Sequence, residues 1–302
     1  MYQTVAKNDT LVTFYHSSPQ FFGYNSDMKK TIAIIITIIT LIAMAYLGKQ
    51  GYLTAKLYEQ KTFEITQQMD AGTLAEYQLK ELANLFTLGL VKNDTKEKIL
   101  SLEKERQLYN TQSRAYALYF AIGAGIILLL YFLLTLQGFT IAVSLAALIA
   151  LINGLITPIL LVIIHKEVEY LGDVVLSFES KGIIGSVAKL YASGSLVVAA
   201  VILLFSVIIP AIKTLSLLFV ATFEHSPFAA KVVRFFKHLG KWSMIDVFVV
   251  AILLVYLTGG SSDTSRAEVE VGLYFFLIYV ILSMVASLSA DKMLHEKTIQ
   301  KP

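Results

Sequence analysis

Six long apolar runs dominate the pattern of hydrophobic and polar positions along the chain. A helix needs about 20 predominantly apolar residues to cross the hydrocarbon core of a bilayer. The pattern therefore predicts an all-α polytopic membrane protein with about six transmembrane helices. The fourth run is overlong and contains Pro210, which predicts a kink or break in that helix. The runs cover approximately residues 31–48, 115–136, 140–164, 190–221, 243–259 and 272–290.

A polar stretch separates the first two runs. Residues 49–114 carry 19 of the 47 charged side chains, 10 cations and 9 anions. Capping-box patterns begin at Thr73 and Asp94, and they predict one helix near 74–91 and another from residue 96 into the second span. We expect an external helical hairpin or small bundle between the first two membrane helices. A folded-back spacer, a contact for a homo-oligomer and a ligand sensor are alternative roles for it.

Two smaller patterns predict local structure. Residues 165–189 alternate apolar and polar side chains around Val174, Leu176 and Phe178, which indicates a short external strand pair or an ordered loop. Gly123 and Gly125 in the second span permit close helix packing and form no cofactor motif.

The composition restricts the function. Hydrophobic residues make up 56% of the chain, charged residues 16%, and the net charge is +3. These values exclude a disordered chain and a simple soluble domain, and no nucleic-acid-binding face is predicted. The absence of cysteine excludes disulfides, zinc ribbons and thiol nucleophiles. The sequence contains no nucleophile elbow, no phosphate-binding loop and no histidine spacing suited to a metal, so it predicts no enzyme activity, no cofactor and no metal site.

The distribution of lysine and arginine predicts the topology. The loop 222–242 is basic and is expected to be cytoplasmic, whereas the loop 260–271 is mainly acidic and is expected to be external. Both termini then lie in the cytoplasm and the module 49–114 lies outside. Residues 28–48 form the predicted anchor helix, with a weakly ordered tail before it (1–27) and a cytoplasmic tail at 292–302.

The beginning of the chain has two interpretations. Met28 and the two lysines after it resemble a natural translation start, so residues 1–27 are either a native tail or an extension. A cleavable signal peptide is the rival, because Ala43 and Ala45 have the spacing of a cleavage site.

Three motifs in the second half resemble those of the paraquat-inducible protein A family. The segment 239–248, Leu-Gly-Lys-Trp-Ser-Met-Ile-Asp-Val-Phe, is similar to that family's G-[RK]-W-S-M-x-D-V-F hallmark. The segment 206–213 is similar to its serine, proline and lysine helix, and residues 272–286 to its final span. Asn153 and Pro158 suit the asparagine and proline of its early span. Trp242, Met244 and Asn153 are therefore expected to be motif or interface residues.

The resemblance implies a single four-helix membrane domain over 140–291 in the bacterial inner membrane. Better-known members of the family work with MCE proteins, which form periplasmic tunnels, and they move lipids between membranes. The resemblance thus implies membrane lipids and a periplasmic MCE-type protein as partners. Those members usually carry two such domains with cysteine zinc ribbons, whereas this chain has one domain and no cysteine.

A polar network is expected within this domain. Lys213 and Asp246 are the two charged residues inside predicted spans, and ionisable groups at membrane depth are functional candidates because they are costly to bury. A coupled lysine–aspartate pair could bind and release a proton. Alternatively, Asp246 caps its helix and Lys213 extends to the headgroups. The expected network consists of Ser206, Lys213, Ser243, Asp246 and Ser283, with helix breaks at Pro158 and Pro210.

A basic segment precedes the hallmark motif. Its four cations recur every three or four residues beside two phenylalanines, which is typical of a helix lying on anionic lipid. They are Lys231, Arg234, Lys237 and Lys241.

Two functions remain open from the sequence. The first is a subunit for lipid or hydrophobic-molecule trafficking across the bacterial envelope. The alternative is a membrane adaptor or stress sensor that acts through the external helical module.

Overall fold

A computed structural model describes residues 20–68, 94–168, 172–223 and 265–300. Helices account for most of these residues, and five of the helical segments are long and apolar enough to cross a membrane. The isoleucines of the first apolar run face outward, with Ile39 61% and Ile42 66% exposed. Such an apolar surface suits lipid rather than water. The prediction of a helical multi-pass membrane protein is confirmed, while the predicted span 243–259 lies outside the described residues.

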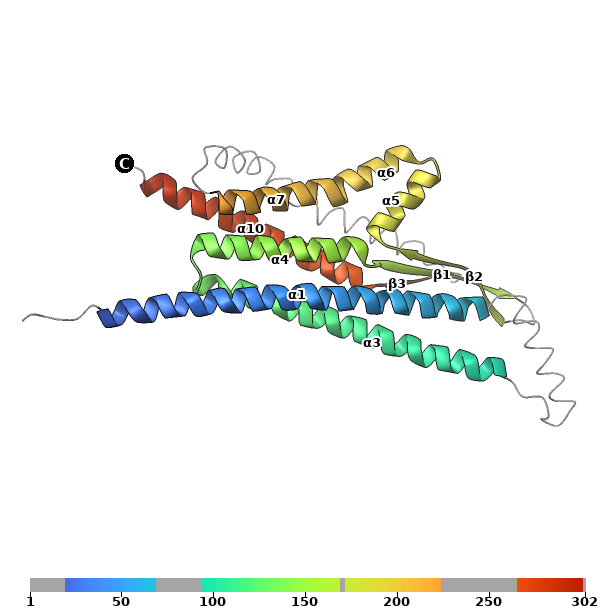
Figure 1. Cartoon of the computed structure of the whole chain (residues 1–302). Coiled ribbons are helices and arrows are strands. Elements are labelled where there is room, and N and C mark those ends of the chain that lie inside the picture. Colours follow the sequence, from blue (N-terminus) through green and yellow to red (C-terminus); the bar gives the residue numbers. More distant parts are fainter. Residues whose placement is uncertain (1–19, 69–93, 169–171, 224–264, 301–302) are drawn as a thin grey trace, which may run out of the picture.

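Two long helices form an antiparallel pair (Figure 1). α1 spans Gln20–Gln68 and α3 spans Asp94–Leu129. At 1.5 Å per residue, the 49 residues of α1 extend about 74 Å, far beyond a hydrocarbon core of about 30 Å. The two helices pair as a hairpin, and α1 is long enough to extend beyond a bilayer; the placement of this hairpin outside the membrane remains a prediction. The predicted helix near 74–91 lies outside the described residues.

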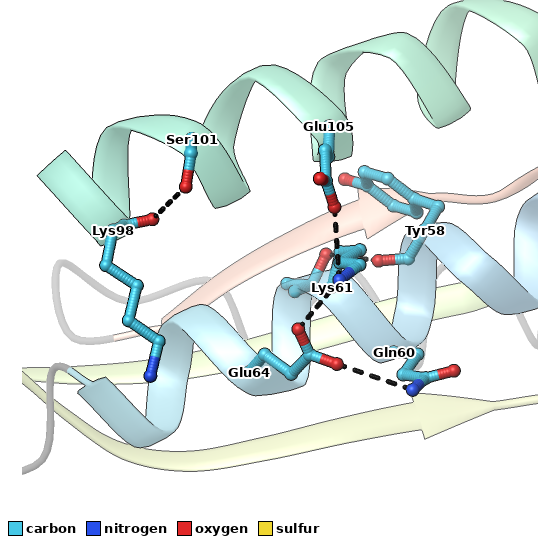
Figure 2. A network of polar contacts seen from close by, with 8 residues as sticks. Tyr58, Gln60, Lys61, Glu64, Lys98, Ser101 and Glu105 are labelled. Atoms are coloured by element: carbon cyan, nitrogen blue, oxygen red, sulfur yellow. Dashed lines mark hydrogen bonds and ion pairs between the residues drawn. The ribbon is translucent and has the colours of Figure 1, made fainter.

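Polar side chains join the two helices of this hairpin (Figure 2). Lys61 Nζ lies 3.0 Å from a carboxylate oxygen of Glu64 and 3.1 Å from one of Glu105 on α3. Arg106 donates to the Tyr58 hydroxyl at 3.2 Å, and Tyr58 itself is only 1% exposed. Exposed ion pairs contribute little to stability, so the buried tyrosine is the stronger element of this contact.

The core of the bundle lies between α4 (Leu136–Ile156) and α10 (Val271–Gln300). A 3-10 turn at Leu130–Phe132 connects α3 to α4. Small side chains line the buried face of α4 and let the two helices approach closely. Gly154 shows how close they are, since a Cβ atom there would lie 2.8 Å from the backbone nitrogen of Phe276. The buried alanines of α4 are Ala142, Ala146, Ala147 and Ala150.

A three-stranded antiparallel sheet covers one end of the bundle (Figure 1). β1 (Leu160–Val168) is central, between β2 (Gly172–Lys181) and β3 (Ser265–Val269). Leu160 pairs with Lys181 on one side and with Val269 on the other. The predicted strand pair is present, and its alternating positions around Val174, Leu176 and Phe178 belong to β2.

The sheet corrects the predicted third span. We expected helix to residue 164, whereas α4 ends at Ile156 and β1 begins at Leu160. Pro158 has no N–H and favours extended backbone at the residue before it. Thr157 is indeed extended, with ψ 143°. The apolar, β-branched run that follows is suited equally to a strand, and its pairing with two neighbours decides the outcome.

The overlong fourth run divides into several pieces. α5 spans Ile183–Ala192, and a turn with Gly194 at φ 82° connects it to α6, Leu196–Leu203. A five-residue π-helical turn at Leu204–Ile208 then precedes α7, Ile209–Thr222. The part Leu196–Thr222 is long and apolar enough to cross a membrane.

Both ends of the described chain are more helical than predicted. α1 begins at Gln20, so residues 20–27 of the expected weakly ordered tail are helical. α10 continues to Gln300 through most of the expected cytoplasmic tail. The extension of α10 contains neither glycine nor proline, and that of α1 contains Gly23 but no proline.

Removing the threonine of a buried hydroxyl pair is expected to weaken the contact between α4 and α10. Thr140 Oγ1 lies 2.6 Å from Ser289 Oγ and also donates to the Leu136 carbonyl oxygen. Thr140→Val leaves the serine without this partner and should lower the free energy of unfolding by about 1–2 kcal/mol. Thermal melting of Thr140→Val, Ser289→Ala and the double variant gives the coupling, expected at ~0.6–1.7 kcal/mol. Additive losses would contradict it.

Candidate functional site

The helix pairing defines which residues share a level in the bundle. Thr140 lies beside Ser289 near one end of the α4–α10 pair, and Gly154 lies against Phe276 near the other. The two helices are therefore antiparallel and in register along their length. Tyr279 on α10 donates to the Pro210 carbonyl oxygen on α7 at 3.4 Å, which fixes the level of α7 as well.

The backbone of the α7 segment is irregular where polar side chains gather. Pro210 has no N–H, so the Ser206 carbonyl four residues earlier loses its usual helical partner. The π-helical turn lies at this point, closed by a bond from Ile209 N–H to the Leu204 carbonyl oxygen. Such turns are frequent at functional sites. The Pro210 carbonyl in turn accepts from Thr214 at 2.9 Å and from Tyr279.

Three polar residues from three helices share one level just beyond this break. Lys213 is three residues after Pro210, and Ser283 is four residues after Tyr279, so both lie about one helical turn past the contact between those two residues. Counting from the contact between Thr140 and Ser289 places Ser144 of α4 within about a turn of the same level. We call Lys213, Ser144 and Ser283 the Lys213 layer.

The Lys213 layer is shielded from the surface. Lys213 is 8% exposed and interacts with other groups, Ser283 is 1% exposed and Ser144 is fully buried. Ser206, one of the predicted network residues, is 4% exposed. The hydroxyls of Ser144 and Ser283 have no hydrogen-bond partner within the part of the chain that the structure describes. Buried hydroxyls are nearly always paired, so these two require a partner from elsewhere.

Two glycines dock α1 against the same bundle. A Cβ atom at Gly48 would collide with the Asn153 side chain of α4, and one at Gly51 would lie 2.7 Å from the Phe275 ring of α10. Asn153 donates to the Ile149 carbonyl at 2.8 Å and is 7% exposed. This predicted motif residue therefore lies where α1 meets α4, and Gly48 leaves the space for its amide.

Eight other predicted site residues belong to the hallmark segment and to the basic segment before it. Both segments lie outside the described residues. The eight residues are Ser243, Asp246, Trp242, Met244, Lys231, Arg234, Lys237 and Lys241. Pro158 lies at the junction of α4 and β1, where its carbonyl accepts from Gly272 N–H at 2.9 Å.

Ser144 was missed by the sequence analysis. It lies in the middle of an apolar helix, and one serine is a weak signal because serine is common in membrane helices. Its spacing of four residues from Thr140 could have marked a polar stripe on α4. The partner helix, however, becomes evident only from the pairing of Thr140 with Ser289.

The arrangement offers a polar layer inside an apolar bundle, next to a helix that is locally loosened. A buried lysine that shares its level in the bundle with buried serines can hold an anionic group or exchange a proton. Among the described residues, no three histidine, aspartate or glutamate side chains are grouped so as to hold a metal ion.

Comparisons with known proteins match the half of the chain that holds this layer. A family model described as Paraquat-inducible protein A matches residues 138–297. The Intermembrane transport protein PqiA of Escherichia coli (strain K12) is 32% identical over 119 residues. The proteins of the same name from Escherichia coli O6:H1 and Shigella flexneri match equally. The match covers 36% of this chain and only 27% of those curated relatives. No solved structure matches.

Proposed function

Because this chain belongs to the paraquat-inducible protein A family, we propose that it moves lipids or other hydrophobic molecules across the bacterial envelope from the inner membrane. The observation that carries this proposal is the family match over 138–297, together with relatives whose name is intermembrane transport protein. The matched region includes the whole Lys213 layer. The proposed role is that of a transport subunit without enzyme activity.

We further propose that the Lys213 layer is the part that moves. Asp246 lies in the matched region and is the expected counter-charge of Lys213, with Ser243 one turn before it. A lysine–aspartate pair at membrane depth titrates as a unit, so protonation of the aspartate would weaken the attraction between α7 and its neighbour. The π-helical turn and Pro210 leave the helix fewer regular backbone bonds to resist that change.

The orientation proposed from the lysine and arginine distribution puts both termini in the cytoplasm. The sheet and the outer halves of α1 and α3 then face the periplasm, since Figure 1 shows them at the same end of the bundle. This end would receive a periplasmic MCE-type tunnel protein. The exposed helices of the hairpin are the proposed contact for a homo-oligomer, and an adaptor role remains the competing function.

The test is a native purification of the full chain with mass spectrometry of everything that accompanies it. The proposal expects bound membrane lipid and a periplasmic partner protein, and it expects the purified chain to transfer labelled phospholipid from donor vesicles to an acceptor. Absence of lipid transfer would overturn the proposal, whether or not lipid or a partner accompanies the chain. A partner without any lipid transfer would favour the adaptor.

A further inference from the structure

A polar pocket lies between the hairpin of α1 and α3 and the region 138–297 that matches the family model. It has a volume of about 560 Å³, within the range of small-ligand pockets. Its walls come from α1, α3, the end of β3 and the start of α10. The lining residues are Tyr58, Glu103, Arg106, Gln107, Asn110, Arg114, Val269 and Tyr274.

One face of α3 supplies most of the polar lining. Arg106, Asn110 and Arg114 are spaced four residues apart and so follow one stripe of the helix. Together with Gln107 and the hydroxyls of Tyr58 and Tyr274 they present many N–H and O–H donors. Among the residues that the structure describes, Glu103 is the single acidic residue of the lining, so the two guanidinium groups give these residues an excess of positive charge.

Arg106 is held in place by a buried aromatic ring. Its guanidinium carbon lies 5.4 Å from the centre of the Tyr58 ring, and its Nη2 donates to the hydroxyl of the same tyrosine. Arg106 also has an interaction besides this contact. A guanidinium has five N–H donors in a fixed plane, so these contacts are compatible with a further acceptor. Arg114 is exposed and forms no ion pair with any residue that the structure describes.

The position of the pocket indicates where its ligand comes from. Arg114 directly precedes the apolar run 115–136, and Tyr274 lies in the first turn of α10, at the start of another span. The inner end of the pocket therefore lies at the level of the lipid headgroups, where amphipathic tyrosines are also favoured. Guanidinium groups match the geometry of phosphate oxygens in bidentate contacts.

We propose that this pocket binds a phosphoryl anion and that the anion is the headgroup phosphate of a membrane phospholipid. Arg114 and Arg106 contact the phosphate oxygens, while Asn110 and Gln107 donate to the rest of the headgroup. The site is distinct from the Lys213 layer. Only the choice of a lipid as the source rests on the proposed function, because free phosphate or a soluble phosphate ester has the same chemistry.

The test is a binding titration of the full chain, purified in detergent and stripped of lipid. Native mass spectrometry would follow the binding of phosphatidylglycerol, and of diacylglycerol with the same acyl chains, and inorganic phosphate would be titrated separately. Loss of a charge-assisted contact predicts an affinity for phosphatidylglycerol that falls ~10-fold in Arg114→Gln and in Arg106→Gln. Diacylglycerol binding should not change.

Two further variants serve as controls. Lys104→Gln removes an exposed cation of α3 that does not line the pocket, so it should bind like the unmodified chain. Arg114→Lys keeps the charge without the planar fork and should give an intermediate loss. Melting curves recorded for every variant would separate a lost contact from a lost fold.

Each outcome decides one part of the proposal. Arginine-dependent binding of phosphatidylglycerol supports both parts, and arginine-dependent binding of inorganic phosphate alone supports the phosphoryl site but overturns the lipid source. If Arg114→Gln and Lys104→Gln bind both probes equally, the pocket is not a phosphoryl site. The binding titration and the vesicle transfer assay are separate experiments. If the chain binds phosphatidylglycerol through the arginines but transfers no lipid, the proposed function is overturned and the phosphoryl site is not.

Discussion

Lys213→Met is expected to lower lipid transfer by the full chain roughly 100-fold, which corresponds to ~3 kcal/mol. Methionine is a flexible apolar side chain that can fill the space of the lysine stem, so the bundle should still fold. What is lost is a buried positive charge at the level of Ser144 and Ser283. Removing one member of a buried polar cluster leaves the others without compensation.

A set of variants separates loss of the charge from loss of the fold. Transfer of labelled phospholipid between vesicles would be measured for Lys213→Met, Asp246→Asn and the double variant. If the two residues act as a pair, the double variant should be no slower than either single variant. Lys189→Met is the matched control, since Lys189 is an exposed lysine on α5. Unchanged transfer in all three variants would exclude the proposed network.

The helical part of this fold is predictable because the bilayer fixes the length of its helices. Apolar runs of about 20 residues indicate spans whatever they pack against. A proline also disrupts a helix locally, without any contact to a distant segment. Pro210 therefore indicated an irregular helix, and the structure has a π-helical turn directly before it.

The parts that sequence analysis missed depend on contacts between distant segments. The apolar residues after Pro158 suit a helix and a strand equally well. They form the strand β1 because they pair with β2 and β3. Ser144 is likewise unremarkable until the register of α4 against α10 places it near Ser283. Of the two glycines singled out in α3, Gly123 packs against Met44 whereas a Cβ atom at Gly125 would meet nothing within 4 Å.

Gly154→Ala is expected to destabilise the bundle, although alanine is by itself the better helix former. The added Cβ would lie 2.8 Å from the backbone nitrogen of Phe276 and 2.9 Å from its Cα. Neither atom can move without α10, because the Phe276 side chain is buried and the helix starts only five residues earlier, at the sheet. Overpacking of this kind costs about 1–3 kcal/mol, and it should exceed the gain of ~1 kcal/mol from replacing glycine within a helix.

Thermal melting of the purified full chain measures this balance. Gly125→Ala is the matched control, since it makes the same exchange within a helix but has open space at the new methyl group. It should melt at or above the temperature of the unmodified chain, whereas Gly154→Ala should melt ~5 °C lower. Gly154→Val adds two further carbon atoms at the same contact and should prevent accumulation of folded protein. If both alanine variants were stabilised alike, α4 and α10 would not approach as closely as the register requires, and the level assigned to Ser144 in the Lys213 layer would lose its basis.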